Sequence, residues 1–112
     1  MEKQYGNPYD DKCPLVYSME IIGTKWKVPI LWFLTREEGL HYNELKRRVH
    51  GITNTMLTKC LRELEGDLIL ERRSLGTVPP SVTYHLTPIG KQLLPSLEQL
   101  SLWGEAHMGL RK

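Results

Sequence analysis

The fold of this chain is decided by residues 43–64, which read NELKRRVHGITNTMLTKCLREL. Their apolar spacing predicts a short amphipathic helix, a break that contains Gly51, and a second amphipathic helix. In the second helix Leu57, Leu61 and Leu64 stand at positions i, i+4 and i+7, so they share one face and should be buried together. The rest of that helix carries polar and basic side chains, namely Thr53, Asn54, Thr55, Thr58, Lys59 and Arg62.

This polar face has the composition of a surface that reads DNA. Hydroxyl and amide side chains can hydrogen-bond base edges in the major groove, and cations such as Lys59 and Arg62 can contact phosphates. We therefore interpret residues 43–64 as a helix-turn-helix whose second helix enters the major groove. Two packed helices with a solvated charged face would give the same pattern, so a module that binds protein instead of DNA stays open as an alternative.

Length and composition are those of a single soluble domain. The chain has 112 residues, of which 40% are hydrophobic and 25% charged, and both values are ordinary for globular proteins. It contains no apolar run of membrane-spanning length, and its first residues lack the apolar core of a signal peptide. We therefore expect a cytoplasmic protein without a membrane partner.

The distribution of charge is more informative than the net charge of +2. Basic residues are concentrated between residues 43 and 73, where acids also occur, so a basic patch requires that folding separates the signs. Besides the second helix, we expect Lys46, Arg72 and Arg73 to contact the DNA backbone. Any such contact should weaken with salt.

The sequence carries no catalytic or metal-binding pattern. The four histidines are scattered, and the two cysteines, Cys13 and Cys60, form neither a disulfide framework nor a metal-ligand cluster. We find no nucleophile elbow, phosphate loop or paired carboxylates. The expectation is a protein that is not an enzyme and that needs no metal or other cofactor.

Two helices are predicted before the motif. Residues 1–12 are polar and should form a flexible arm. An apolar stripe from Pro14 predicts a helix that ends at Gly23. Thr24 is the expected N-cap of a second, almost wholly apolar helix, but Pro29 conflicts with that start. Either the helix begins nearer Trp26 or its first turn is distorted. Within the motif, the expected N-caps are Asn43 and Thr53.

A β-hairpin is predicted directly after the motif. Residues 68–73 resemble a strand, residues 81–86 alternate between apolar and polar, and the Gly- and Pro-containing residues 74–80 join them. A hairpin in this position is a wing, and its tip near Thr77 should contact the DNA backbone. Thr87 and the proline after it then start a last helix over about 88–108, which Pro95 should kink.

The last helix carries more apolar residues than one small domain can cover. A stripe of Ile89, Leu93, Leu97 and Leu100 is accompanied by Leu94, Leu102 and Trp103. The surplus indicates a partner surface, most simply a second copy of the chain.

Short motifs in a fixed order carry a family resemblance. They are Cys13-Pro14, Gly23-Thr24-Lys25-Trp26-Lys27, Glu44-Leu45-Lys46-Arg47, Gly51-Ile52-Thr53, Met56-Leu57-Thr58, Leu61-Arg62-Glu63-Leu64, Val78-Pro79-Pro80, Val82-Thr83-Tyr84, Leu86-Thr87-Pro88-Ile89-Gly90, Leu93-Leu94-Pro95 and Trp103-Gly104. Across residues 13–105 the chain resembles the HxlR family of bacterial winged-helix regulators, which is akin to the MarR-type repressors.

The resemblance implies a mainly α fold with a small β-hairpin wing. It implies a winged helix-turn-helix over residues 13–108, with a three-helix core, terminal dimerisation helices and a short tail at 109–112. It further implies that residues 53–62 enter the major groove of an operator and that the wing tip reaches the neighbouring backbone. The homodimer interface would use the two terminal helices, and the residues we expect there are Leu15, Met19, Leu94, Leu97, Leu102 and Trp103.

The two cysteines differ in what the sequence predicts for them. Several members of the resembled family sense electrophiles or oxidants through a cysteine at the position of Cys13. A helix start favours the reactive thiolate, although a small buried hydrophobe is an equally ordinary role. Cys60 flanks the leucine stripe, which favours packing, while relatives usually have a long polar residue there.

One further position departs from the family pattern. Relatives commonly carry a glycine where this chain has Leu68, which suggests that Gly66 takes the left-handed conformation instead. The sequence as a whole predicts a sequence-specific transcriptional regulator that binds a pseudo-palindromic operator as a homodimer. Its switch would be oxidation or alkylation of Cys13, or alternatively a small apolar ligand between the core and terminal helices.

Overall fold

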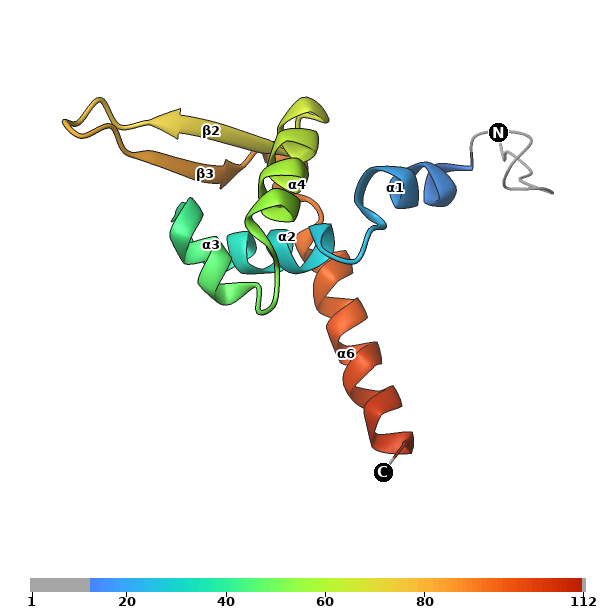
Figure 1. Ribbon diagram of the computed structural model, residues 1–112. Coiled ribbons are helices and arrows are strands. Elements are labelled where there is room, and N and C mark those ends of the chain that lie inside the picture. The colour runs from blue at the N-terminus through green and yellow to red at the C-terminus, as the bar shows by residue number, and fades with distance from the viewer. Residues whose placement is uncertain (1–12, 112) are drawn as a thin grey trace.

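A computed structural model describes residues 13–111 as a winged helix with a protruding C-terminal helix (Figure 1). The expected arm over residues 1–12 lies outside the described residues. The elements in chain order are α1 (Pro14–Ile22), α2 (Lys27–Thr35), β1 (Leu40–His41), α3 (Tyr42–Arg48), α4 (Asn54–Gly66), β2 (Leu70–Ser74), β3 (Val82–Leu86), α5 (Pro88–Lys91) and α6 (Leu94–Leu110).

The helical core forms around one face of α4, as the leucine spacing predicts. Leu57 and Leu64 are fully buried and Leu61 is nearly so. They pack with apolar residues of the other elements, among them Ile30, Leu31, Leu34, Leu40, Leu45, Val49, Ile52, Leu70, Leu86 and Leu97. Burying a side chain of this size contributes roughly 1.5–3 kcal/mol, so the single stripe on α4 is a principal source of stability.

The helices α2 and α3 do not begin at the N-caps first expected, and α2 follows the alternative start near Trp26. The N-cap of α2 is Trp26 and not Thr24, so Pro29 is the third residue of α2. A backbone N–H at this position would have no hydrogen-bond acceptor within the helix, so proline is tolerated there. The N-cap of α3 is His41 and not Asn43. The reason lies in Glu44, whose carboxylate accepts a hydrogen bond from the backbone N–H of His41 at 2.9 Å.

The wing is part of a three-stranded antiparallel sheet in the order β1-β3-β2. In the hairpin Leu70 pairs with Leu86 and Ser74 pairs with Val82. The short β1 adds a third strand, with Leu40 opposite Tyr84. This extra pairing ties the base of the wing to the start of α3, so the wing is fixed relative to the helix-turn-helix.

The junction between α4 and the wing corrects an expectation about Gly66. Gly66 is the last residue of α4, and the left-handed residue is Leu68, with φ of 64°. The backbone N–H of Leu68 donates to the carbonyl of Glu65, and that of Ile69 donates to the carbonyl of Leu64, both at 3.0 Å. This pair of bonds is the Schellman helix end, which normally has glycine where Leu68 stands.

The expected last helix is two helices. Thr87 caps α5 by accepting a hydrogen bond from the N–H of Gly90 at 3.2 Å, which confirms the predicted start. The helix does not continue to Leu93, because Pro95 has no N–H to give to the carbonyl of Lys91 and its ring would collide with that carbonyl. A new helix, α6, therefore begins at Leu94 and continues to Leu110, two residues beyond the expected end.

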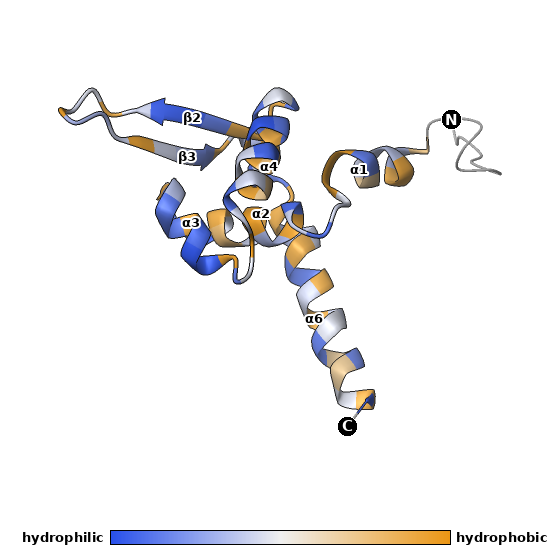
Figure 2. Ribbon diagram, in the orientation of Figure 1, coloured by the Kyte–Doolittle hydropathy of each residue, from blue (hydrophilic) through white to orange (hydrophobic). Residues whose placement is uncertain are grey.

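The terminal helices leave apolar side chains exposed. Hydrophobic residues lie on several sides of α6 as it leaves the domain (Figure 2), and on α6 and α1 the largest exposed ones include Leu15, Met19, Leu100, Leu102, Trp103, Met108 and Leu110. Leu97, which we expected at a dimer interface, is instead 5% exposed inside the chain's own core, and Leu94 is half-buried. No helix within residues 13–111 has the length and apolar character to cross a bilayer.

Replacing Leu68 by glycine should stabilise the fold. Leucine in the left-handed region is strained, and its side chain is 72% exposed, so little packing is lost. We expect Leu68→Gly to raise the free energy of unfolding by about 1 kcal/mol, measured by urea denaturation. Leu75→Gly is the matched control, because Leu75 is also exposed but has no positive φ. Equal destabilisation by both substitutions would contradict the strain at Leu68.

Candidate nucleic-acid interface

The turn and the cap before α4 present its first residues to solvent. Gly51 has φ of 89°, a backbone conformation that residues with a Cβ atom rarely adopt. The turn at Gly51 reverses the direction of the chain after α3. The hydroxyl of Thr53 then accepts a hydrogen bond from the N–H of Met56 at 3.1 Å, as the expected N-cap. With the leucine stripe buried, the opposite face of α4 points away from the domain.

The polar residues predicted on α4 are brought together on that face. Thr53, Asn54, Thr55, Lys59 and Arg62 are exposed, and Thr58 is half-buried. A shallow hollow is lined by the side chains of Asn54, Thr55, Thr58, Lys59, Arg62 and Glu63. The exposed side of α4 is hydrophilic, as is most of β2 beside it (Figure 2).

A second cleft joins α4 to the wing. It has a volume of about 320 Å³ and is lined by Tyr42, Thr58, Leu61, Arg62, Glu65, Arg72 and Tyr84. Arg62 comes from α4 and Arg72 from β2, so two cations far apart in the sequence lie around one cleft. Two guanidinium groups around one cleft suit a phosphate of a nucleic-acid backbone.

The structure separates Arg73 from this group. Alternation along β2 turns Arg73 to the other face of the wing, where it lines a hollow with Glu37 and Glu38. Its guanidinium donates to the carboxylate of Glu71 at 3.2 and 3.3 Å. These hydrogen bonds hold the pKa of Glu71 below its ordinary value, so Arg73 already has a negative partner.

The remaining predicted residues lie apart from the cleft. Lys46 is half-buried on α3. Thr77 is at the tip of the wing, where its hydroxyl donates to the carbonyl of Pro79 at 2.8 Å. Thr77 therefore has the expected place at the far end of the hairpin, while Lys46 belongs to the other helix of the motif.

Tyr42 is a residue of this surface that sequence reasoning missed. Its hydroxyl lies 3.0 Å from the backbone oxygen of Asn54 and 3.0 Å from the hydroxyl of Thr58. Tyr42 thus connects the first residue of α3 to the first turns of α4. No pattern in the sequence marked it, because one half-buried tyrosine at a helix start is an ordinary core residue.

Lys27 is the second missed residue, and it supports α4 from inside. Lys27 is only 4% exposed. Its ammonium group donates hydrogen bonds to the carboxylate of Glu63 on α4 at 3.0 Å and to the carbonyl of Ile21 on α1 at 3.2 Å. One buried cation therefore joins α1, α2 and α4. A lysine within an otherwise apolar helix was the signal that could have revealed it.

The two cysteines have different surroundings. Cys13 is half-buried at the N-cap of α1. Cys60 is buried on α4, and burial raises the pKa of its thiol, an effect that the ammonium of Lys27 partly opposes. The packing role predicted for Cys60 agrees with this burial. Within residues 13–111 no three metal-ligating side chains come together.

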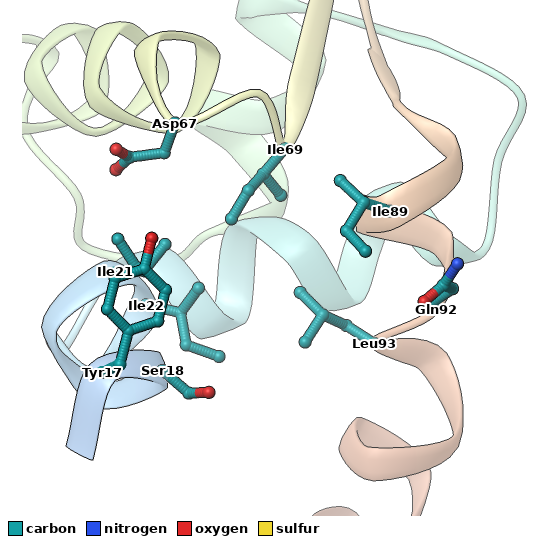
Figure 3. Close-up of a pocket in the computed structure, with 9 residues that line it drawn as sticks. All are labelled: Tyr17, Ser18, Ile21, Ile22, Asp67, Ile69, Ile89, Gln92 and Leu93. Carbon is teal, nitrogen blue, oxygen red and sulfur yellow. The ribbon is translucent and has the colours of Figure 1, made fainter. Parts of the chain in front are cut away.

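An apolar pocket lies away from the polar face, between α1 and α5. Its volume is about 420 Å³, and its lining consists of Tyr17, Ser18, Ile21, Ile22, Asp67, Ile69, Ile89, Gln92 and Leu93. Figure 3 shows the side chains of α1 on one side and Ile89 and Leu93 on the other, with Ile69 between them. Small ligands bind in apolar pockets of this size with a few polar groups at the rim.

The chain is similar in sequence to a known family of proteins. The sequence profile described as HxlR-like helix-turn-helix matches residues 21–112. The HTH-type transcriptional regulator YybR of Bacillus subtilis is 40% identical over 106 residues, which cover 95% of this chain and 84% of YybR.

Two solved structures of regulators in their reduced forms are similar as well. The redox regulator HypR in its reduced form has a TM-score of 0.82 and 37% identity, over 88% of this chain and 96% of HypR. The reduced transcriptional regulator YodB of B. subtilis has a TM-score of 0.72 and 29% identity, over 83% and 91% of the two chains.

Removing Glu63 should destabilise the protein more when Lys27 is present than when it is absent. Glu63→Ala leaves the buried ammonium of Lys27 with the Ile21 carbonyl alone, which should lower the free energy of unfolding by about 2 kcal/mol. The loss should be smaller than for a fully buried ion pair, because Glu63 is 42% exposed. Lys27→Met with Glu63→Ala should recover part of that loss. The measurement is a double-mutant cycle by chemical denaturation, and additive effects would show that the pair does not interact.

Proposed function

Because the chain belongs to the HxlR-like helix-turn-helix family of transcriptional regulators, we propose that it binds duplex DNA as a homodimer on a pseudo-palindromic operator. The observation that carries this proposal is the cleft between α4 and β2. There Arg62 and Arg72 flank the hydrophilic face of α4, which presents hydroxyl, amide and ammonium groups to solvent. The likeness to transcriptional regulators such as YybR supports the proposal.

The side chains divide into two roles. Thr53, Asn54, Thr55 and Thr58 would contact base edges, since they stand on the first turns of α4. Lys59, Arg62, Arg72, Lys46 and Thr77 would hold phosphates and fix the register of the protein on the duplex. Arg73 has a smaller part than the sequence suggested, because Glu71 binds it on the other face of the wing.

Substituting the cleft arginines should weaken DNA binding at every sequence. We expect Arg62→Ala and Arg72→Ala each to lower affinity for the DNA upstream of the chain's own gene, and each to reduce the slope of log K against log salt by roughly 0.9. Fluorescence anisotropy at several salt concentrations measures both. Arg73→Ala is the matched control and should change the slope less. If Arg73→Ala changed the salt slope as much as Arg72→Ala, the proposal that Arg72 contacts phosphate more than Arg73 does would be wrong.

The terminal helices support a homodimer. Leu102 and Trp103 on α6 are 58% and 65% exposed, and Leu15 and Met19 on α1 are 69% and 53% exposed. A symmetric pair would cover such faces and would set two copies of α4 about 34 Å apart, one turn of DNA. This spacing is what a pseudo-palindromic site requires.

A charge on α6 should separate the dimer. We expect Leu102→Glu to convert dimer to monomer in sedimentation velocity without unfolding the chain, since Leu102 lies on the surface of one copy. Leu75→Glu is the matched control, because Leu75 is 53% exposed on the wing and should leave the oligomeric state unchanged. A Leu102→Glu protein that stays dimeric would remove α6 from the interface.

Cys13 is the proposed switch. It begins α1, and α1 is tied through the Ile21 carbonyl and Lys27 to Glu63 on α4, so a modification at Cys13 has a path to the DNA-binding helix. The likeness to the redox regulator HypR and to YodB, which has a structure in a diamide-treated form, supports a thiol switch. The pocket in Figure 3 offers the alternative, a small apolar effector.

Oxidation should change DNA affinity through Cys13 alone. Diamide with added glutathione should join Cys13 to the glutathione thiol in a mixed disulfide, with the two thiol hydrogens passing to diamide. This should shift the affinity of the unmodified protein and leave Cys13→Ser unaffected, whereas Cys60→Ser should still respond. The reason is that Cys60 is buried and its raised pKa keeps the unreactive thiol form. Gel shift with and without diamide measures this. A response that survives in Cys13→Ser would refute the Cys13 switch.

A further inference from the structure

We propose that Tyr42 is a positioning residue that fixes the hydrogen-bonding direction of Thr58. Through Thr58 it would make one position in each half-site specific for a base that presents an amino group in the major groove, adenine or cytosine. The inference rests on the proposed DNA binding and adds to it the chemistry that one base must have. It follows from three polar groups between α3 and α4.

The acceptors around Tyr42 favour one arrangement of hydrogens. The hydroxyl oxygen of Tyr42 lies 3.0 Å from the backbone oxygen of Asn54 and 3.0 Å from the hydroxyl oxygen of Thr58. The Tyr42 hydroxyl also lies 3.4 Å from the side-chain oxygen Oδ1 of Asn54. Both oxygens of Asn54 only accept hydrogen bonds, so Tyr42 donates its single hydroxyl proton to Asn54. The hydroxyl of Thr58 must then donate to Tyr42, because two oxygens 3.0 Å apart with no proton between them would repel.

Thr58 is consequently an acceptor toward anything outside the protein. Its one hydroxyl proton is committed to Tyr42, and the lone pairs that remain on its oxygen accept. Thr58 is half-buried and lines the hollow with Asn54, Thr55, Lys59 and Arg62 on the exposed face of α4. A ligand group that meets this oxygen must therefore bring a proton.

The major groove offers such protons at only two kinds of atom. Adenine presents its N6 amino group and cytosine its N4 amino group, whereas guanine and thymine present carbonyl acceptors at the same edge. An acceptor oxygen at Thr58 therefore favours adenine or cytosine on the contacted strand. A freely rotating threonine hydroxyl could serve either class, so the discrimination depends on Tyr42.

A second tyrosine supplies the matched control. Tyr84 lines the same cleft between α4 and the wing, but within the described residues no hydrogen bond involves its hydroxyl. Tyr84→Phe therefore removes a hydroxyl from the same cleft without releasing Thr58. Thr58→Ser keeps the hydroxyl and Thr58→Val removes it, so the pair isolates the acceptor itself and leaves Tyr42 in place.

The experiment is selection of binding sites from a library of random DNA duplexes, followed by sequencing. The unmodified protein should enrich a motif in which one position per half-site is restricted to adenine or cytosine. Tyr42→Phe and Thr58→Val should lower that preference by about three- to tenfold at the same position and leave the other positions intact. Tyr84→Phe and Thr58→Ser should keep it. Circular dichroism melting confirms that each variant is folded.

The outcomes are separable. If the unmodified protein enriches no motif, the proposed function fails and the inference fails with it. If a motif appears but Tyr42→Phe and Thr58→Val select it unchanged, the inference alone is overturned. Equal relaxation by Tyr84→Phe would also overturn it, because the effect would then belong to the cleft in general. Should Tyr42→Phe fail to fold, the contrast between Thr58→Val and Thr58→Ser decides.

Discussion

The buried ammonium of Lys27 is the constraint on which the rest of the structure depends. A cation removed from water is costly unless it is paired and hydrogen-bonded, and Lys27 meets this requirement through Glu63 on α4 and the Ile21 carbonyl on α1. Since Glu63 must face Lys27, the rotation of α4 about its axis is fixed together with its leucine stripe. The face that carries Asn54 and Thr55 is therefore directed outward.

The same interaction explains how the terminal helices communicate with α4. α1 is held at its last turn by Lys27, and α6 packs against α2, the helix that carries Lys27. Both helices that leave apolar side chains exposed thus attach to the element that supports α4. A change in how two copies of the chain meet, or in the chemistry at Cys13, would act on the DNA-binding surface through α2 without needing direct contact.

Local patterns predicted most of the fold. The leucines at 57, 61 and 64 fixed the buried face of α4, Thr53 and Thr87 marked two helix starts, and the alternation around Tyr84 marked β3. Most of the misses depend on contacts between segments that are distant in the sequence. The partners of Lys27 lie on α1 and α4, so no local pattern could show them. Leu97 was expected at the dimer interface, but α6 packs against α2 and buries it in the core.

At the candidate site, too, local patterns predicted some features and contacts between distant segments determined others. Spacing on α4 predicted which side chains share its exposed face, and the placement of Arg62 with Arg72 required only that a wing follow α4. The role of Tyr42 needed the structure, because residues 42 and 58 meet only when α3 and α4 are packed. Leu68 was missed for a different reason: a left-handed leucine opposes residue preference, and the two hydrogen bonds of the helix end hold it there.

The central claim is that the face of α4 together with the wing binds duplex DNA. The most direct test is a titration of the ¹⁵N-labelled protein at low salt with a DNA duplex from upstream of its own gene. The amide chemical shifts of the protein are measured at each step. The account predicts the largest changes in residues 53–62 and in the wing at 72–80, with small changes at the far end of α6. Changes centred on α6 or on the pocket between α1 and α5, with α4 unaffected, would contradict it.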